Sequence, residues 1–517
     1  FLLVELFSDL NSQSIVTLPF DWSNHNGVLF HDGILLSNQS WASGILQFDG
    51  SQSAYPYRYD GKLQNNIHIT EVGELPKFST LPDSAASQSY FDYVRGDYGL
   101  DILDLGINYL KKNNFLKLGA FKRSSMGNFA HYVHPVNANN PIHQSYRVDY
   151  SNYNKDERIE LSAGRYLTKS GLPDELQNGY ENDNIISTAL RYQKKYDLWT
   201  YNLYASQSSQ HRSLMHSIYT DSIAHFVNRT AIEFQIKHYR GYQLGLSHKL
   251  SHFNRDSFNR TLKWSSIYLM KNYDKISFLG GAQFSKNDLY QPFVFSATYL
   301  DSSSIGKIKI ASYGESRPAH PGLSTFKNKF ENRLRSSVFY DFNFKSLFIQ
   351  SYVTSITLKA DTLYSNTFSY IGTNATYAFD ANWKIYIKIF SSLSSSIENK
   401  FGTKIESGLF GMTKLFEGNM IASFHIWLDH YQNTTSYFSY DPFLQFQLND
   451  QNKNYKIAGR DIVNFDLEAN VSGVLLNLKI FNVLNFVDSS RSTFKPIALY
   501  PQIGRMLQFG VTWYFVN

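Results

Sequence analysis

The sequence predicts an all-β protein: one transmembrane, antiparallel, up-and-down β-barrel of about 22 strands, within a range of roughly 20 to 24. Three observations predict it. Apolar and polar residues alternate, the alternating segments are long, and short connections alternate with long ones along the chain. The composition agrees. Aromatic residues make up 16% of the 517 residues and charged residues only 18%, although the mean hydropathy is −0.34. Strands with one face toward lipid and one toward water have this composition.

The alternation begins near residue 88 and continues to the end of the chain. The segment Trp383–Ile389 is typical, with Trp or Ile at each odd position and Lys or Tyr at each even position. A period of two indicates a strand, because successive side chains point to opposite faces. The segments run for about 10 to 15 residues, whereas strands of soluble proteins average about 5 to 6. The greater length is what a tilted strand needs to cross a bilayer.

The connections between these segments fall into two classes. Ten tight turns are expected at Asn113–Asn114, Lys155–Asp156, Tyr196–Asp197, Arg240–Gly241, Tyr273–Asp274, Ser302–Ser304, Phe344–Lys345, Ala381–Asn382, Glu417–Gly418 and Ser472–Gly473. Looser connections are expected at 126–142, 169–184, 208–225, 317–327, 433–461 and 485–503. With one more strand before Gly99 and one at 504–516, about 22 strands result, with short periplasmic turns and long extracellular loops. The sheet must close, because lipid offers no partners for free backbone groups.

Composition also excludes several classes of protein. No stretch reaches the roughly 20 apolar residues of a membrane-spanning helix. The apolar opening Phe1–Phe7 is shorter, and is either the tail of a secretory signal or an ordinary β segment. The chain has no Cys, so disulfides and thiolate metal sites are excluded. The net charge of +6 is spread without a basic run, so we expect no nucleic-acid partner.

The last strand carries a signal of its own. In GRMLQFGVTWYFVN, at 504–517, one face is apolar and aromatic, and its members include Phe509, Val511, Trp513 and Phe515. An amphipathic final strand with an aromatic residue near its end looks like the recognition signal of the barrel-insertion machinery. We therefore expect this machinery and outer-membrane lipid to be partners, and the bacterial outer membrane to be the location.

The final two strands resemble the end of TonB-dependent receptors. In that family an Asn-Leu-Phe-Asn-like stretch precedes a Pro-Gly-Arg turn into the last strand. Asn482, Leu484 and Asn485 match the first part, Gly504 and Arg505 match the second, and an Ile stands at 503 where the family usually has Pro. The resemblance covers about the last 60 residues. It implies a barrel of about 22 strands, solute uptake, and a TonB-type energy complex as a partner if a plug domain exists.

The first 87 residues depart from the pattern of that family. They are rich in Ser, Asn, Gly and Pro, their alternation is broken, and no plug ending is recognisable in them. We interpret 1–87 as an irregular segment that is a plug remnant, a lumen insert or a periplasmic piece, and 88–517 as the barrel. The stretch Gly27–Leu36 has the look of a plug hairpin, but a plain hairpin explains it better.

Charged residues on alternate positions are candidates for the wall of a lumen. They are Lys307, Lys309, Glu331, Arg333, Arg335, Lys384 and Lys388. Such residues would set a solute preference, for instance for anions. The simpler interpretation is a wet lumen whose cross-strand pairs stabilise the sheet.

Histidines gather in two of the expected loops. They are His131, His134 and His143 in one, and His211, His216 and His225 in the other. Imidazoles converging from two loops can bind a metal. No metal-binding spacing accompanies them, so we interpret them as solvated and predict neither a metal nor a cofactor.

The leading functional hypothesis is an outer-membrane uptake protein or channel for a small solute. The alternatives are a plug-free passive porin, and a barrel that anchors or assembles an outer-membrane complex. The sequence has no Gly-x-Ser-x-Gly element, no Ser/His/Asp constellation and no paired carboxylates in one strand register. We therefore do not expect an enzyme.

Overall fold

The described part of the chain is almost entirely β structure. This computed structural model describes residues 87–124, 142–171, 180–215, 223–255, 258–285, 294–304, 306–318, 330–360, 364–393, 403–436, 438–441, 446–449, 455–486 and 505–516, together with Gly73, Leu75, Phe78 and the backbone of five short segments nearer the N-terminus. Within these residues no helix is both long and apolar enough to cross a membrane.

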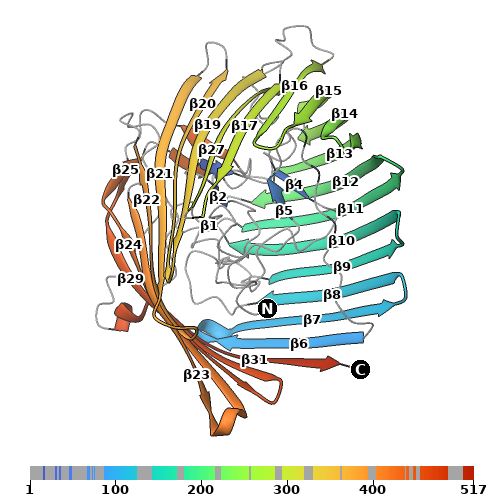
Figure 1. The fold of residues 1–517 in the computed structure, drawn as a ribbon. Helices are drawn as coiled ribbons and strands as arrows, with labels where there is room; N and C mark the ends of the chain where they lie inside the picture. The colour runs from blue at the N-terminus through green and yellow to red at the C-terminus, as the bar shows by residue number, and fades with distance from the viewer. Residues whose placement is uncertain are drawn as a thin grey trace.

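A closed antiparallel barrel forms the body of the molecule (Figure 1). Its strands are β6 (Ser87–Gly96), β7 (Leu100–Lys111), β8 (Asn114–Ser124), β9 (Ile142–Tyr153), β10 (Glu157–Gly171), β11 (Tyr180–Tyr196), β12 (Trp199–Met215), β13 (Ile223–His238), β14 (Tyr242–Arg255), β15 (Phe258–Asn272), β16 (Ile276–Ser285), β17 (Val294–Ser302), β18 (Gly306–Pro318), β19 (Phe330–Phe344), β20 (Leu347–Ala360), β21 (Tyr364–Ala378), β22 (Trp383–Ser392), β23 (Lys404–Leu415), β24 (Met420–Tyr431), β29 (Arg460–Val471), β30 (Val474–Phe481) and β31 (Met506–Val516). Each strand pairs with the next, and β31 pairs with β6, so that Val511 lies opposite Tyr93. The predicted antiparallel barrel of about 22 strands is confirmed.

Smaller sheets accompany the barrel. The short strands β1 (Val16–Thr17), β2 (Leu29–His31) and β3 (Ile34–Leu36) form one sheet, and β4 (Leu46–Phe48) pairs with β5 (Ile67–Ile69). Within the expected loop 433–461, β25 (Thr434–Ser436) pairs with β28 (Tyr455–Ile457), and β26 (Phe438–Asp441) pairs with β27 (Phe446–Asn449). Three 3-10 turns lie at Asp97–Gly99, Phe416–Gly418 and Val483–Phe486.

The ten tight turns lie at or within a residue or two of their predicted positions. Several use the left-handed backbone region, which suits short hairpins. Asp197, Lys345 and Ser472 have φ near 51°, and Gly241 has φ 82°. These turns all connect strands at one end of the barrel, which we name the turn end. The opposite end, where the longer connections lie, we name the loop end.

The predicted bounds of two loops were wrong, because strands extend into both of them. β12 continues to Met215 and β13 resumes at Ile223, so most of 208–225 is strand; β10 and β11 similarly enter 169–184. The outward positions Ser209 and Ser213 carry no apolar side chain, which hid the strand from a search for apolar alternation. The hydrogen-bonded ladder continues regardless, because both neighbours of β12 extend as far as its loop end.

The two faces of the sheet differ as the alternation predicts. On β19 the side chains of Arg333 and Arg335 are 7% exposed, whereas Leu334 between them is 45% exposed. The outward face is apolar along most of its length. At the turn end, exposed aromatic residues lie on the last strand positions and in the turns themselves; they include Tyr196, Tyr239, Tyr273, Phe344 and Phe416. Aromatic belts of this kind mark the level of a membrane interface.

Tyrosines on the inward face lie across glycines of the neighbouring strand. The directly opposed pairs are Tyr90 with Gly106, Tyr268 with Gly245, Tyr352 with Gly372, and Tyr386 with Gly408. A Cβ added at Gly245 would lie 1.9 Å from Cζ of Tyr268. Glycine is therefore required there because the ring occupies the space of a side chain.

Candidate functional site

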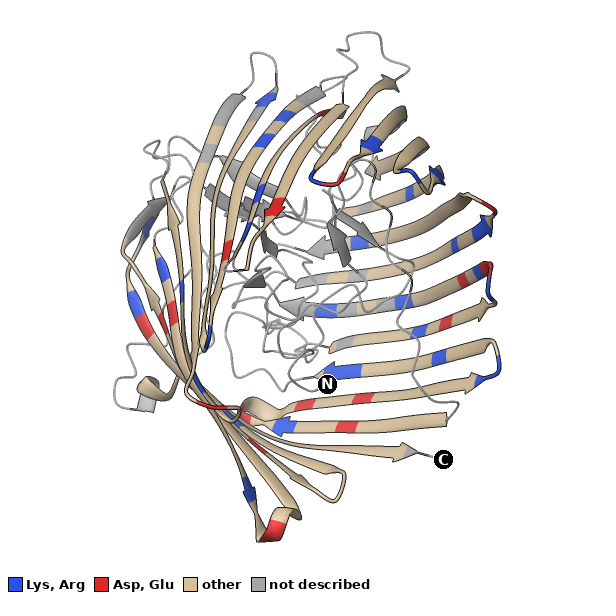
Figure 2. Ribbon diagram, in the orientation of Figure 1, with Lys and Arg blue, Asp and Glu red and all other residues tan. Residues whose placement is uncertain are grey.

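The inward face of the barrel holds most of the buried polar groups. In the described part of the chain seven arginines and five acidic residues are buried. Six of these arginines lie in the loop-end halves of their strands: Arg123, Arg212, Arg229, Arg260, Arg333 and Arg335. Lysines and arginines recur along the strands of the wall (Figure 2). The buried charge of the inner wall is thus biased toward positive, most strongly near the loop end.

A buried polar cluster lies on β13, β14 and β15. Glu233 Oε1 accepts hydrogen bonds from Tyr268 Oη at 2.9 Å and from Gln235 Nε2 at 3.1 Å. Tyr268 is 1% exposed and Gln235 is 0% exposed. Burial of a carboxylate requires partners, because its lost hydration has to be compensated. We name Glu233, Gln235, Gln243 and Tyr268 the buried cluster.

The buried cluster also binds a residue from before the barrel. The carbonyl of Gly73 accepts hydrogen bonds from Gln235 Nε2 at 3.1 Å and from Gln243 Nε2 at 3.2 Å. Gly73 has φ 95°, and a Cβ there would lie 2.7 Å from Leu279 Cδ1. Farther around the wall, the guanidinium carbon of Arg158 lies 4.7 Å from the centre of the Phe78 ring. These contacts attach Gly73 and Phe78 to the inward face.

A second group of charges lies on β22, β23 and β24. Lys388 Nζ is 2.8 Å from Glu406 Oε1, and Lys404 Nζ is 3.0 Å from Asp429 Oδ1. The sign of the charge therefore alternates along the row Lys388, Glu406, Lys404 and Asp429, in which Glu406 and Lys404 both belong to β23. These side chains are 13–38% exposed, so they are more open to solvent than the buried cluster. We name Lys388, Glu406, Lys404 and Asp429 the charge ladder.

The charge ladder continues onto β29 and β30. There Lys479 Nζ lies 3.1 Å from Asp466 Oδ2, and Asn464 Nδ2 donates to Asp429 Oδ2 at 3.1 Å. Nearer the turn end, Lys384 Nζ lies over the Phe410 ring, 4.7 Å from its centre. A solute passing this arc would meet alternating charges and hydrogen-bonding groups.

The predicted lumen residues occupy inward positions wherever their side chains are described. Lys307 and Lys309 share the face of the buried Tyr313 and Glu315 on β18. Arg333 and Arg335 are buried on β19, and Lys384 and Lys388 alternate with the outward Ile385 and Ile387 on β22. Glu331 belongs to β19, but its side chain lies outside the described residues. Their influence on a solute stays a prediction.

The stretch that resembles TonB-dependent receptors forms a turn at the loop end. Asn482 is 3% exposed with φ 53°, and its N–H donates to Asn464 Oδ1 at 3.0 Å. Asn485 accepts a hydrogen bond from the N–H of Arg505 at 3.3 Å, and Arg505 Nη2 lies 3.5 Å from Asp97 Oδ2. Asn482 therefore anchors this turn to β29, and Asn485 connects it to Arg505, directly before the last strand.

Two further positions of this stretch match the family, but they give less information about the turn. Leu484 is half-buried in the same turn, and Gly504 lies outside the described residues.

The apolar face predicted for the last strand points outward. Phe509 is 53% exposed, Trp513 48% and Phe515 40%, and Val511 shares their face. The alternate residue Thr512 is buried and donates to Asp92 Oδ1 at 2.7 Å, across the closure of the barrel. A role of the outward row in insertion stays a prediction.

Most of the histidine side chains in the two predicted groups lie outside the described residues. His131, His134 and His216 lie outside the described residues, as do the side chains of His143 and His225. His211 is exposed on the outward face of β12, so its assignment to a loop was wrong. Among the described residues no three His, Asp or Glu side chains come together as metal ligands.

Sequence reasoning missed the buried arginines outside β19. Arg212 was hidden because its segment was assigned to a loop, although a polar alternation of Ser208, Gln210 and Arg212 marks the inward face. It also missed the buried cluster. Glu233 alternates with apolar residues, which predicts its face but gives no information about Gly73, 162 positions from Gln235.

Comparison with known proteins places the fold. No family model and no curated protein matches the sequence. Among solved structures, the FrpB iron transporter of Neisseria meningitidis has a TM-score of 0.65 at 11% identity, covering 84% of this chain and 82% of that one. A mutant of the ferric enterobactin receptor PfeA of Pseudomonas aeruginosa scores 0.64 at 8% identity, covering 84% and 81%.

The siderophore receptor PirA of Acinetobacter baumannii scores 0.63 at 8% identity, with coverages of 84% and 81%. At such identities the likeness shows the fold alone. At that level the predicted barrel, similar to that of TonB-dependent receptors, is confirmed.

Proposed function

We propose that this protein is an outer-membrane uptake barrel that passes a small solute through its lumen. The observation that carries the proposal is the closed barrel itself, apolar and aromatic outside, polar and rich in arginine inside. This arrangement suits a wall between lipid and water. The similar solved structures are described as an iron transporter and as siderophore receptors, which supports uptake and agrees with the expectation that the chain is not an enzyme.

The segment before β6 acts in this proposal as a lumen insert. Support comes from Gly73, whose carbonyl is held by Gln235 and Gln243 on the inner wall. Each of the two hydrogen bonds from the buried amides contributes about 1 kcal/mol to the free energy of attachment, so the attachment is weak. A TonB-type energy complex pulling on this segment would be able to displace it.

The inner wall in this proposal favours anionic solutes. Support comes from the excess of buried arginines over buried acids and from the exposed Lys307 and Lys309. Fixed positive charge along a pore raises the local concentration of anions and lowers that of cations.

Liposome swelling tests occlusion. The full chain in liposomes should admit small sugars slowly, and the double variant Gln235→Leu/Gln243→Leu should admit them faster, because Gly73 loses both donors. The matched control is Gln508→Leu on β31, a buried inward glutamine whose Nε2 donates to Met506 Sδ. Rapid swelling with the unaltered chain would instead support the plug-free porin. No permeation with any variant, together with a co-purifying protein, would support the anchor.

Reversal potentials in planar bilayers test the anion preference. The double variant Lys307→Gln/Lys309→Gln removes two positive charges from the inner wall. In a KCl gradient its reversal potential should therefore shift toward the equilibrium potential of K⁺. The control, Lys271→Gln/Lys345→Gln, removes the same charge from the outward face and a turn. Equal shifts in both variants would show that the inner wall does not select.

A further inference from the structure

A basic patch lies on the outward face of the barrel at the loop end of β8 to β12. Its members are Lys122, Arg165, Lys169 and His211, all exposed. We name them the outer basic patch. They occupy outward positions, since on β10 Arg165 and Lys169 alternate with inward residues and follow the outward Leu161, which is 44% exposed. Cations are not expected on a face that meets only hydrocarbon, because their dehydration is costly.

The pairing of β8, β9 and β10 brings the residues of the outer basic patch close together. Lys122 lies opposite Gln144, which in turn lies opposite Leu167, so Lys122 is level with the midpoint between Arg165 and Lys169. Arg165 Nε donates to Asn184 Oδ1 at 3.3 Å, and because this acceptor is a neutral amide the bond does not compensate the charge of the guanidinium. In the described part of these strands no ion pair involves Lys122, Arg165 or Lys169, so three positive charges stand together.

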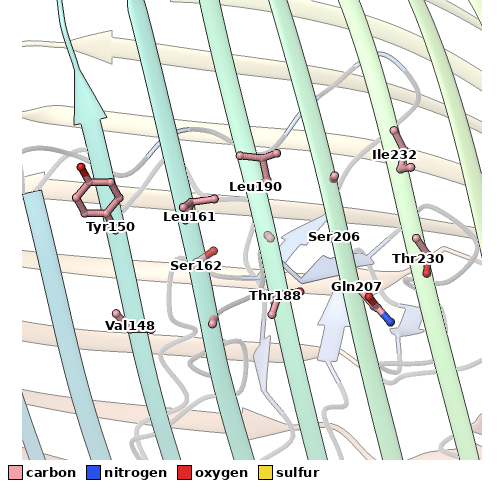
Figure 3. A pocket seen from close by; sticks show the side chains of 13 residues that line it. Val148, Tyr150, Leu161, Ser162, Thr188, Leu190, Ser206, Gln207, Thr230 and Ile232 are labelled. Atoms are coloured by element: carbon pink, nitrogen blue, oxygen red, sulfur yellow. The ribbon is translucent and has the colours of Figure 1, made fainter. Parts of the chain in front are cut away.

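A hollow lies in the outward wall on the membrane side of the patch (Figure 3). Its volume is about 520 Å³. Small residues form its floor, namely Ala163, Thr188, Ala205 and Thr230, and the larger Tyr150, Leu161 and Ile232 line it as well. Ala163 is the outward residue directly before Arg165 on β10, so the hollow and the patch are continuous.

We propose that the patch and the hollow together bind one phosphate-bearing lipid of the outer leaflet. The phosphate lies among Lys122, Arg165 and Lys169, and an acyl chain fills the hollow between Leu161 and Ile232. Arginine and lysine are the side chains that bind phosphate best, and a free phosphate would leave the adjoining apolar hollow unused. The inference rests on the membrane location in the proposed function, and adds a specific lipid site to it.

Lipid titration in native mass spectrometry tests the site. The ligand is a bisphosphorylated, acylated glucosamine disaccharide, added to protein in mild detergent, with its dephosphorylated form as the comparison. Lys122→Gln/Arg165→Gln/Lys169→Gln should weaken binding on the order of 100-fold, because each cation near an anionic lipid surface contributes about fivefold. The control Lys111→Gln/Lys194→Gln/Lys271→Gln removes three outward charges at the turn end and should change binding less than about twofold.

A second variant tests the hollow. Ala163→Phe/Ala205→Phe fills it and should weaken binding of the acylated lipid while leaving the preference for the phosphorylated form. Equal losses in the patch and control variants would overturn the phosphate site, and unchanged binding in the filled variant would overturn the acyl site. All variants are first checked for insertion into liposomes. Failure of the unaltered chain to insert would refute the membrane barrel, whereas insertion without selective binding would refute only the lipid site.

Discussion

The buried cluster and the charge ladder use the same kinds of side chain in different surroundings. Both lie on inward faces, and both place a glutamate beside a tyrosine that covers a glycine. The buried cluster is closed over by Gly73, and Tyr268 is 1% exposed. The side chains of the ladder are 13–38% exposed. Inward charge therefore occurs in two surroundings in one barrel: closed off beneath Gly73 in the buried cluster, and partly open to solvent in the charge ladder.

The largest expected difference concerns the two glutamates. Glu233→Ala removes the acceptor of Tyr268 and Gln235 in a dry site and should lower the free energy of unfolding by about 3 kcal/mol. Glu406→Ala on the ladder should lower it by about 1 kcal/mol, because water replaces the lost contacts. Urea unfolding in detergent micelles measures both. Glu233→Gln, which retains an acceptor, should recover part of the loss. Equal losses for both alanine variants would remove the distinction between the two regions.

The glycines beneath the tyrosines give the next difference. Gly245→Val forces its side chain into the ring of the fully buried Tyr268, and should cost about 3 kcal/mol of stability. Gly408→Val meets the same ring atoms of Tyr386, but at 2.6 Å or more and in a less buried ring, and should cost about 1 kcal/mol. Gly280→Val is the control, since nothing lies within 4 Å of its added Cβ. The three midpoints of urea unfolding should follow this order, and a larger loss at Gly408 than at Gly245 would contradict it.

The smallest effect is expected at the exposed end of the ladder. Lys388→Met breaks the ion pair with Glu406, in which Lys388 is 38% exposed. The loss should be at most about 1 kcal/mol, and it should shrink further in 1 M salt, where the screening length falls to about 3 Å. Paired unfolding curves at low and high salt measure it. A loss of unfolding free energy that does not depend on salt would contradict this prediction, because it would show that the ion pair is as shielded from solvent as the buried cluster.

The barrel and its turns could be predicted because both depend on local patterns. Alternation assigns each strand residue to a face, and turns such as Arg240–Gly241 and Ser472–Gly473 contain a glycine that adopts the left-handed backbone region. The loop-end edges were harder. Above the apolar band, the outward residues of β12 are polar, so nothing in the local pattern separates the strand from a loop.

The candidate site was only partly predictable. Alternation places Arg333 and Lys384 on one face, but their neighbours depend on strand order and register. The contact of Gly73 with Gln235 joins residues 162 positions apart, and no periodicity within either segment contains it. The outer basic patch was missed for the same reason, since Lys122 and Arg165 meet only through the pairing of β8, β9 and β10.

The closure between β31 and β6 has a consequence for how the molecule is made. Asp97 Oδ2 accepts a hydrogen bond from the N–H of Leu507 at 2.9 Å, and these residues are 410 positions apart. One ladder edge of β6 is therefore satisfied only by the last strand of the barrel. A barrel that lacks β31 has a free edge on β6, and such an edge is open to pairing with other chains. Closure therefore depends on a contact of very high sequence separation, which is the kind of contact that slows folding.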